Sequence, residues 1–317
     1  VSVLMFSENE NIRKFWLGCG ISAALTVLCF FKYFDFFRLI IQQYTGQSAV
    51  IDILLPLGLS YYTFQSLAYL VYCYREPKGD RFEWHELLLH LSFFPTITSG
   101  PIIRADAFKS IDGEQAGALA QIRTKQARQL IYPALAVGLI VLGIAKKWWL
   151  AGVLAEDWVS PVFENPAQFD GWGVLSAIYG YTFQLFFDFS GYSDLVIGLA
   201  MLLGFQLPKN FAAPLRAINI RDFWDRWHIS LSTWIRDYIY IPLGGSKKGF
   251  GRTQLNLMIA MLLSGIWHGY GWSFLIWGAL HGAALVFLNC GDKIVGRNAL
   301  GRLKIGKPLA WLFTFHF

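Results

Sequence analysis

The chain has 317 residues, of which 55% are hydrophobic and only 15% are charged. A soluble domain usually has about 25% charged residues, so this chain has too few to cover a water-exposed surface. The composition therefore excludes an ordinary soluble protein and predicts one that is embedded in a membrane.

Uncharged stretches follow one another along the chain. The longest, 253–291, contains no Asp, Glu, Lys or Arg. It is nearly twice the ~20 residues that one membrane-spanning helix needs. We expect membrane segments at roughly 15–37, 53–74, 86–103, 129–149, 171–187 and 194–207, with one or two more within 254–290.

Several of these segments are too short or too interrupted to cross ~30 Å as straight helices. Pro95 and the run Ser99-Gly100-Pro101 break the third segment, and 194–207 is short. Irregular backbone at membrane depth is tolerated only where protein or a water-filled cavity satisfies its polar groups. The sequence therefore predicts an all-α, polytopic membrane helical bundle in which short, tilted and re-entrant helices surround a central funnel.

We expect residues 1–317 to form a single membrane-embedded domain. The chain begins without Met and without a basic, cleavable signal peptide, and it stops inside the apolar run 309–317. These features lead us to expect further spans beyond both ends.

The segment 208–252 is polar, basic and aromatic. Asn219 fits the N-cap of a helix from Ile220 to about Tyr240, which the turn residues 242–245 would end. The chain's net charge of +6 comes from Lys and Arg in such connections, and positive charge resists translocation. We therefore expect an amphipathic segment on the cytoplasmic side and no binding of nucleic acid.

Two ion pairs are expected on that helix. Arg221 and Asp225 are spaced i,i+4, and so are Asp222 and Arg226. Such pairs suit a helix that lies at the membrane surface or dips into it.

His268 is the most informative of the six histidines. It lies in the longest uncharged stretch, where an ionisable side chain is costly and indicates a functional site. A neutral imidazole there could accept a proton, and Gly265, Gly269 and Gly271 would let substrate approach closely. We expect the adjacent Trp267 to wall this site. The alternative is a structural histidine bonded to a backbone carbonyl.

For two further histidines the indication of a functional site is weaker. His228 has a candidate orienting carboxylate in Asp225, and Ser232 falls on the same helix face; the alternative is a surface histidine in a salt-bridged helix. His281 lies about 140° from His268 around a single helix of 3.6 residues per turn, so we expect it to serve in packing.

Other polar residues allow both a structural and a functional interpretation. Asp188 and Asp194 lie between apolar segments, where an uncompensated carboxylate is costly, so they should face the cavity or bond to the basic helix. A structural role in a loop is equally open. Lys247 and Lys248 form either a basic juxtamembrane turn or a contact for the phosphates of a soluble donor.

No metal site is predicted. His85 and His90 are spaced i,i+5, whereas the zinc-binding helix motif requires i,i+4. The four cysteines include no C-x-x-C pair and fit small buried hydrophobic residues.

The motifs together resemble the membrane-bound O-acyltransferase (MBOAT) family, and within it the bacterial branch that includes the membrane subunit of alginate O-acetylation. The matching pieces run in order along most of the chain. They are residues 55–62, 99–104, 187–194, 223–234 and 265–269.

The resemblance implies transfer of an acyl group to a hydroxyl in a multi-pass protein of the bacterial inner membrane. His268 matches the family's catalytic histidine, and His228 matches its second functional histidine. The implied donor is a cytoplasmic acyl thioester, acetyl-CoA, with no bound cofactor. The implied acceptor is a periplasmic partner protein that completes O-acetylation of an exported or cell-wall polysaccharide, while membrane lipids surround the chain.

Two alternatives remain open. One is D-alanyl transfer from a small carrier protein to a cell-wall polymer, for which Lys247 and Lys248 could suit an acidic carrier. The other is a non-enzymatic polysaccharide or lipid transporter with histidines in a proton path, although the paired broken helices typical of transporters are not evident.

Overall fold

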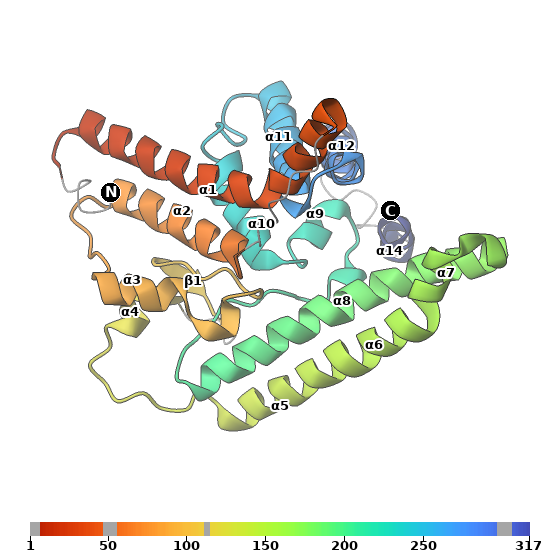
Figure 1. Cartoon of the computed structure of the whole chain (residues 1–317), viewed down its shortest axis with the longest axis horizontal. Helices are drawn as coiled ribbons and strands as arrows, with labels where there is room; N and C mark the ends of the chain where they lie inside the picture. The colour runs from red at the N-terminus through yellow and green to blue at the C-terminus, as the bar shows by residue number, and fades with distance from the viewer. Residues whose placement is uncertain (1–6, 47–55, 111–114, 297–305) are drawn as a thin grey trace. The chain divides into compact units, whose positions relative to one another are not determined.

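The computed structural model describes residues 7–46, 56–110, 115–296 and 306–317. The expected all-α fold is confirmed, because the described chain is a set of helices with one small sheet (Figure 1). That sheet pairs β1 (Ala107–Lys109) with β2 (Gln115–Gly117) in antiparallel register. The start of the expected segment 53–74, residues 53–55, lies outside the described residues.

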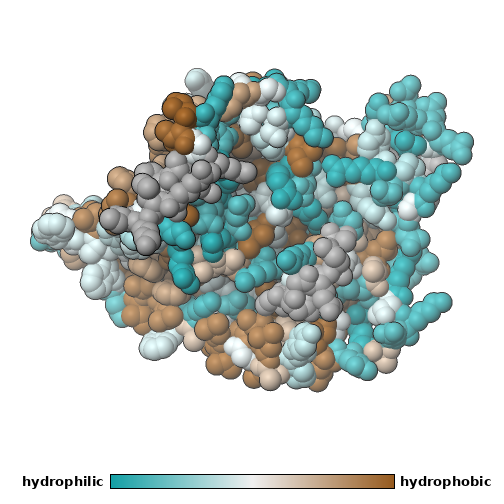
Figure 2. Space-filling model, turned by 180° about the vertical axis from the view of Figure 1, so that it is seen from behind, coloured by the Kyte–Doolittle hydropathy of each residue, from teal (hydrophilic) through white to brown (hydrophobic). Residues whose placement is uncertain are grey.

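Four helical stretches of the described chain are long and apolar enough to cross a membrane. They are Glu10–Phe34, Pro133–Glu164, Gly171–Leu202 and Trp272–Val295. Many large apolar side chains on them are exposed, among them Leu135, Val141 and Phe287. Figure 2 shows such apolar side chains gathered on the surface of the molecule, as a lipid-covered exterior requires.

The chain divides into two compact units. One unit comprises 78–210, and the other joins 1–77 to 211–317.

The 78–210 unit is built on a long helical hairpin. Its first arm is continuous from residue 133 to 164, and its second arm, α8 (Gly171–Leu202), packs along it (Figure 1). The first arm consists of α5 (Pro133–Ile144), the π-helical turn η3 (Ala145–Leu150), α6 (Ala151–Leu154), the π-helical turn η4 (Ala155–Val159) and α7 (Ser160–Glu164). The short turn η5 (Pro166–Gln168) joins the arms.

Small residues let the two arms of the hairpin approach closely. A Cβ atom on Gly143 would lie 2.6 Å from the carbonyl oxygen of Gly191, and one on Gly198 would lie 2.6 Å from that of Ala136. Small residues are common at helix contacts in membranes because they permit this backbone contact.

The separate segments expected at 171–187 and 194–207 are wrong, because α8 is one continuous helix. Asp188 and Asp194 do not break it. The Nζ atom of Lys147 lies 2.5 Å from Asp188 Oδ1, and that of Lys146 lies 2.7 Å from Asp194 Oδ2. Since both carboxylates are neutralised by the facing arm, the helix carries them without leaving its regular path. The segment expected at 129–149 also continues further, to Glu164, because its Lys146 and Lys147 are paired with the carboxylates of α8.

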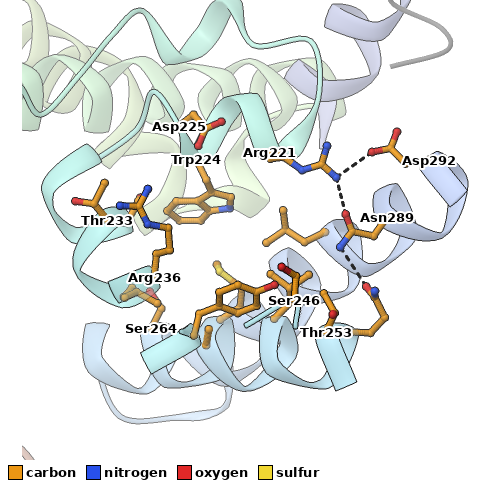
Figure 3. A pocket seen from close by; sticks show the side chains of 18 of the residues that line it. Arg221, Trp224, Asp225, Thr233, Arg236, Ser246, Thr253, Ser264, Asn289 and Asp292 are labelled. Atoms are coloured by element: carbon orange, nitrogen blue, oxygen red, sulfur yellow. Dashed lines mark hydrogen bonds and ion pairs between the residues drawn. The ribbon is translucent and has the colours of Figure 1, made fainter. Parts of the chain in front are cut away.

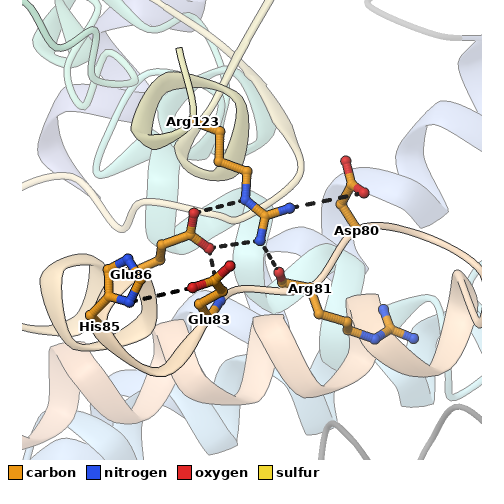
Figure 4. Close-up of polar contacts among 6 residues, drawn as sticks. All are labelled: Asp80, Arg81, Glu83, His85, Glu86 and Arg123. Carbon is orange, nitrogen blue, oxygen red and sulfur yellow. Dashed lines mark hydrogen bonds and ion pairs between the residues drawn. The ribbon is translucent and has the colours of Figure 1, made fainter. Parts of the chain in front are cut away.

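The interruption expected in 86–103 is confirmed. The helix α3 (Trp84–Leu91) ends before Pro95, which lies in the short 3-10 turn η2 (Phe94–Thr96). Arg123, which directly follows α4 (Ala118–Ile122), joins this region by hydrogen bonds to both oxygens of Glu86, at 2.8 and 2.7 Å, and to the carbonyl of Arg81 (Figure 4).

The other unit contains two helix pairs. The helices α1 (Glu10–Thr45) and α2 (Leu59–Arg75) pack together, and so do α11 (Phe250–His268) and α12 (Trp272–Val295). A Cβ atom on Gly265 would lie 2.3 Å from the carbonyl oxygen of Phe274, so the second pair is in close backbone contact. The short helix α14 (Gly306–His316) completes the described chain.

Short helices occupy the polar segment of this unit. After the turn η6 (Pro214–Arg216), the chain forms α9 (Ile220–Trp224), α10 (Ile229–Ile235) and the π-helical turn η7 (Arg236–Tyr240). The Nε1 atom of Trp234 donates a hydrogen bond to the carbonyl of Phe64, so α10 is fixed against α2.

The prediction of a single helix from Ile220 to Tyr240 is wrong for the middle of this segment. Its N-cap is confirmed, because Asn219 Oδ1 accepts from the amide of Asp222, and its end near Tyr240 is also confirmed. The helix breaks between Trp224 and Ile229, where His228 adopts a left-handed backbone with φ of +43°.

The two expected ion pairs have different outcomes. Arg226 Nε lies 2.6 Å from Asp222 Oδ1, which confirms that pair. The pair of Arg221 with Asp225 is wrong, because Arg221 Nη2 lies 3.0 Å from Asp292 Oδ2 of α12 instead.

Candidate active site

His268 is the last residue of α11, and its side chain is exposed. The chain then passes through Gly269 and Gly271 before α12 begins. The imidazole packs against two indole rings, with centroids 4.7 Å from Trp267 and 5.0 Å from Trp277. The end of a helix therefore presents this histidine, rather than the middle of an apolar span.

His228 lies in the break between α9 and α10 and is only 3% exposed. Burial, and then the charge of His268, lowers the pKa of His228 from 6.5 to about 3. The imidazole is therefore neutral at physiological pH, with one ring nitrogen that donates a hydrogen bond and one that accepts. The effect of the His268 charge on His228 places the two histidines, although 40 residues apart, within electrostatic range of each other.

His281, which the sequence predicted to serve in packing, forms a histidine group with His228 and His268. Its charge also interacts with that of His268, and its ring lies 4.6 Å from Trp277 and 5.3 Å from Trp224. Its Nδ1 atom is buried and has no hydrogen-bond partner in the described part of the chain. The expected separation of 140° assumed one helix, whereas the turn at 269–271 places His281 on a different helix from His268.

The aromatic rings around the histidines connect α2, α11 and α12. Trp267 lies 5.2 Å from Phe64 as well as 4.7 Å from His268, and Trp277 stands between His268 and His281. Trp267 thus contacts the histidine that it was expected to wall. Its role remains a prediction.

A cavity of about 960 Å³ opens beside this group (Figure 3). Asp225, Ser232 and Ser264 line it, and so does Trp224. Neither His228 nor His268 lines it, so this cavity does not bring the two histidines together. The reason is local: the helix break moves His228 off the face on which Asp225 and Ser232 would have accompanied it.

The cavity combines an apolar wall with charged groups. Leu257, Met261 and Leu285 supply apolar surface. At one side, Arg221 bonds to Asp292 and also to the side chain of Asn289 (Figure 3). A volume near 1,000 Å³ with a few polar groups is typical of a site for an organic ligand.

The other candidate residues belong to other elements of the fold. Asp188 and Asp194 belong to the 78–210 unit and form the ion pairs described above. Lys247 and Lys248 are exposed in the turn before α11, and neither lines the cavity, although Ser246 does. Within the described ranges, no three His, Cys, Asp or Glu side chains gather as metal ligands.

Comparison with known proteins agrees with these features. The sequence model of the membrane-bound O-acyltransferase family matches residues 14–317. The chain is 39% identical to a probable alginate O-acetylase of Pseudomonas aeruginosa over 95% of its own length and 55% of that protein. It is 33% identical to a peptidoglycan O-acetyltransferase of Helicobacter pylori, over 98% of its own length and 62% of that protein.

A third relative acts on another substrate. The chain is 30% identical to a teichoic acid D-alanyltransferase of Bacillus subtilis, over 82% of its own length and 66% of that protein. The chain thus spans little more than half the length of the O-acetylating relatives that it matches.

The family match covers nearly all of the chain, and the motifs that carry the resemblance fall on the histidine group as well as on α8. The family match together with the four candidate spans makes the chain a multi-pass protein of the bacterial inner membrane. From these observations, the chain belongs to the membrane-bound O-acyltransferase family.

Proposed function

We propose that this protein is a membrane O-acyltransferase that moves an acetyl group from a cytoplasmic acyl thioester, acetyl-CoA, to a hydroxyl acceptor. Its role would be O-acetylation of an exported or cell-wall polysaccharide. The observation that carries the proposal is the family match over residues 14–317, and the position of His268 at the end of α11, between the rings of Trp267 and Trp277, supports it. The O-acetylation for which two of the relatives are named supports the choice of acetyl as the group transferred.

The proposed chemistry needs one base and a second residue that orients or polarises a reacting group. His268 accepts the proton of the acceptor hydroxyl as its oxygen attacks the thioester carbonyl carbon. A C–O bond forms, the C–S bond then breaks, and the departing thiolate takes the proton from His268. His228, buried and neutral, holds a reacting group in place. Positioned acid–base help of this kind is typically worth about 10²–10⁴-fold in rate.

The cavity beside the histidines is the proposed place for the arm of the donor. Its apolar wall suits the pantetheine chain, and Asp225 and Ser232 offer polar contacts along it. Lys247 and Lys248 stand in the turn before α11, where they would meet donor phosphates on the cytoplasmic side. On the far side, we propose that a periplasmic partner protein receives the acetyl group.

The cytoplasmic position of 208–252 can be measured directly. A cysteine introduced at Ser246, in a cysteine-free background, should react with an impermeant thiol reagent only after the membrane is opened. Ser246 is exposed and borders the cavity, so its accessibility reports the side on which the donor arrives. Labelling in intact cells would reverse the proposed orientation.

D-alanyl transfer is the second candidate, because a teichoic acid D-alanyltransferase is among the relatives. One assay distinguishes the two functions. Purified protein in liposomes is given labelled acetyl-CoA, or a carrier protein loaded with labelled D-alanine, and transfer to a soluble acceptor is counted. We expect transfer from acetyl-CoA alone. Transfer from the loaded carrier alone would reject the proposed donor, and transfer from neither would reject both candidates.

A further inference from the structure

Lys32 reaches the end of α11 from an apolar helix. It lies in the candidate membrane span Glu10–Phe34 of α1 and is half-buried. Its Nζ atom donates a hydrogen bond to the carbonyl of Trp267 and lies 4.9 Å from the centre of the Trp267 ring. A lysine within a span is costly and indicates a function by default.

The neighbouring residue makes a similar contact without a charge. The hydroxyl of Tyr33 donates to the carbonyl of Ile266. The last carbonyls of a helix have no partner within the helix, so both side chains cap the C-terminal turn of α11. A cation is the better cap of the two, because the C-terminal end of a helix carries partial negative charge.

The charge of Lys32 also reaches the candidate base. Lys32 interacts electrostatically with His268, the residue that directly follows Trp267. The other titratable groups whose charges couple to His268 are His228, in the break between α9 and α10, and His281 on α12. Both are imidazoles, so among these groups Lys32 supplies the positive charge at neutral pH.

We propose that Lys32 is a positioning residue of the acyl-transfer site, which fixes the last turn of α11 and places a positive charge beside His268. The inference rests on the proposed function. During transfer, negative charge develops on the oxygen of the acyl carbonyl, and a fixed positive charge nearby stabilises it. The same charge disfavours protonation of His268, so that the imidazole stays ready to accept the proton of the acceptor hydroxyl.

Four variants of the full protein separate charge from capping. Lys32→Met removes both the charge and the cap, Lys32→Arg keeps the charge, and Tyr33→Phe removes only the neutral cap. Lys14→Met is the matched control, because Lys14 is an exposed lysine of the same helix whose partner is Glu10 at 2.7 Å. Thermal unfolding in detergent shows whether each variant is folded.

We expect Lys32→Met to lower kcat by roughly 10-fold, less than the 10²–10³-fold lost with a direct oxyanion donor, because Lys32 acts through the position of the last turn of α11 and the charge beside His268. KM for the donor should change by less than about 3-fold, and Lys32→Arg should recover much of the rate. Tyr33→Phe and Lys14→Met should remain near the wild-type rate. Equal losses in Lys32→Met and Tyr33→Phe would overturn the proposal, because capping alone would then explain the effect.

A second measurement does not depend on acyl transfer. Diethylpyrocarbonate modifies neutral imidazoles, and His268 is exposed. In Lys32→Met, the pH at which His268 becomes reactive, followed by peptide mass spectrometry, should move upward, because a neighbouring positive charge has been removed. An unchanged profile would overturn the role of Lys32. If the profile moves while the wild-type protein transfers no acetyl group, the proposed function fails and the electrostatic coupling stands.

Discussion

The hairpin of the 78–210 unit and the histidine group of the other unit differ in how far their polar side chains are paired. In the hairpin, Lys146 faces Asp194 and Lys147 faces Asp188, each at ion-pair distance. The charges cancel in pairs, and α8 runs straight past them from Gly171 to Leu202.

The histidine group has irregular backbone and incompletely satisfied atoms. His228 sits at a helix break in a left-handed conformation, and His268 ends a helix at a glycine-rich turn. The Nδ1 atom of His281 and the Nε1 atoms of Trp224 and Trp267 are buried without a hydrogen-bond partner among the described residues.

The comparison distinguishes polar groups that hold a membrane fold together from polar groups that are kept available for a substrate. The paired charges of the hairpin need no ligand, although Gln184 Oε1 and Ser190 Oγ of α8 are also buried without a hydrogen-bond partner among the described residues. Buried atoms without partners, beside a helix end and a cavity of about 960 Å³, are a cost that a bound substrate could offset. We therefore expect substitutions in the hairpin to affect stability, and substitutions in the histidine group to affect rate.

The largest effect should come from His268→Ala. Removing a residue that transfers a proton should lower acetyl transfer by at least ~10²-fold, while the variant still inserts and unfolds near the wild-type temperature. His85→Ala is the matched control, since His85 is an exposed histidine paired with Glu83 at 3.6 Å. Activity above about a tenth of wild type, or failure to fold, would return His268 to a structural role.

Breaking one ion pair of the hairpin should destabilise the protein. Lys146→Met leaves Asp194 charged and largely buried, which we expect to cost about 1–3 kcal/mol, less than for a fully buried pair. Transfer per folded molecule should stay within about 3-fold of wild type. The measurement is the thermal unfolding midpoint in detergent.

The second pair supplies the internal control for this prediction. The Asp188 side chain is 50% exposed, against 21% for Asp194. Lys147→Met should therefore shift the midpoint less than Lys146→Met does. A loss of rate without loss of stability in either variant would contradict the structural role of the hairpin charges.

A smaller effect should appear in the pH dependence of stability. The pKa of His228 is about 3 in the folded protein, against 6.5 ordinarily, because of burial and then of the charge on His268. Between these values the unfolded chain binds a proton that the folded chain does not, so stability should fall as pH decreases from 6.5. Above pH 6.5 both states are neutral at this residue, and the contribution is constant.

His228→Asn should flatten this decline, because it removes the titrating group. Asn tolerates the left-handed backbone at this position, so the comparison is not dominated by strain. The midpoint of thermal unfolding, followed from pH 7.5 to 4.5, makes the measurement, with His85→Asn as the control. An equally steep decline in His228→Asn would show that other groups cause it.

The helical class and the membrane setting could be predicted because they depend on local composition. Uncharged stretches and the break at Pro95 need no knowledge of distant partners. The break predicted near Asp188 and Asp194 failed because their compensating lysines lie more than 40 residues earlier in the chain. A carboxylate looks costly in one segment until its partner on the next helix is known.

The site could be predicted only in part, for a similar reason. His268 and His228 could be singled out by environment and motif. The left-handed backbone of His228 has no signal in the residues around it, since a non-glycine residue rarely adopts that conformation. Lys32 was missed, and His281 was assigned to packing alone, because their relation to His268 comes from packing between helices, although Gly269 and Gly271 could have indicated two helices.

The central claim, that His228 and His268 act as one unit, is tested most directly by a double-mutant cycle of acetyl transfer. His228→Asn, His268→Ala and the double variant are compared with wild type, each corrected for the folded fraction. Residues that act together show non-additive losses, so the double variant should be little worse than the worse single variant. Losses that multiply would show two independent roles and contradict the claim.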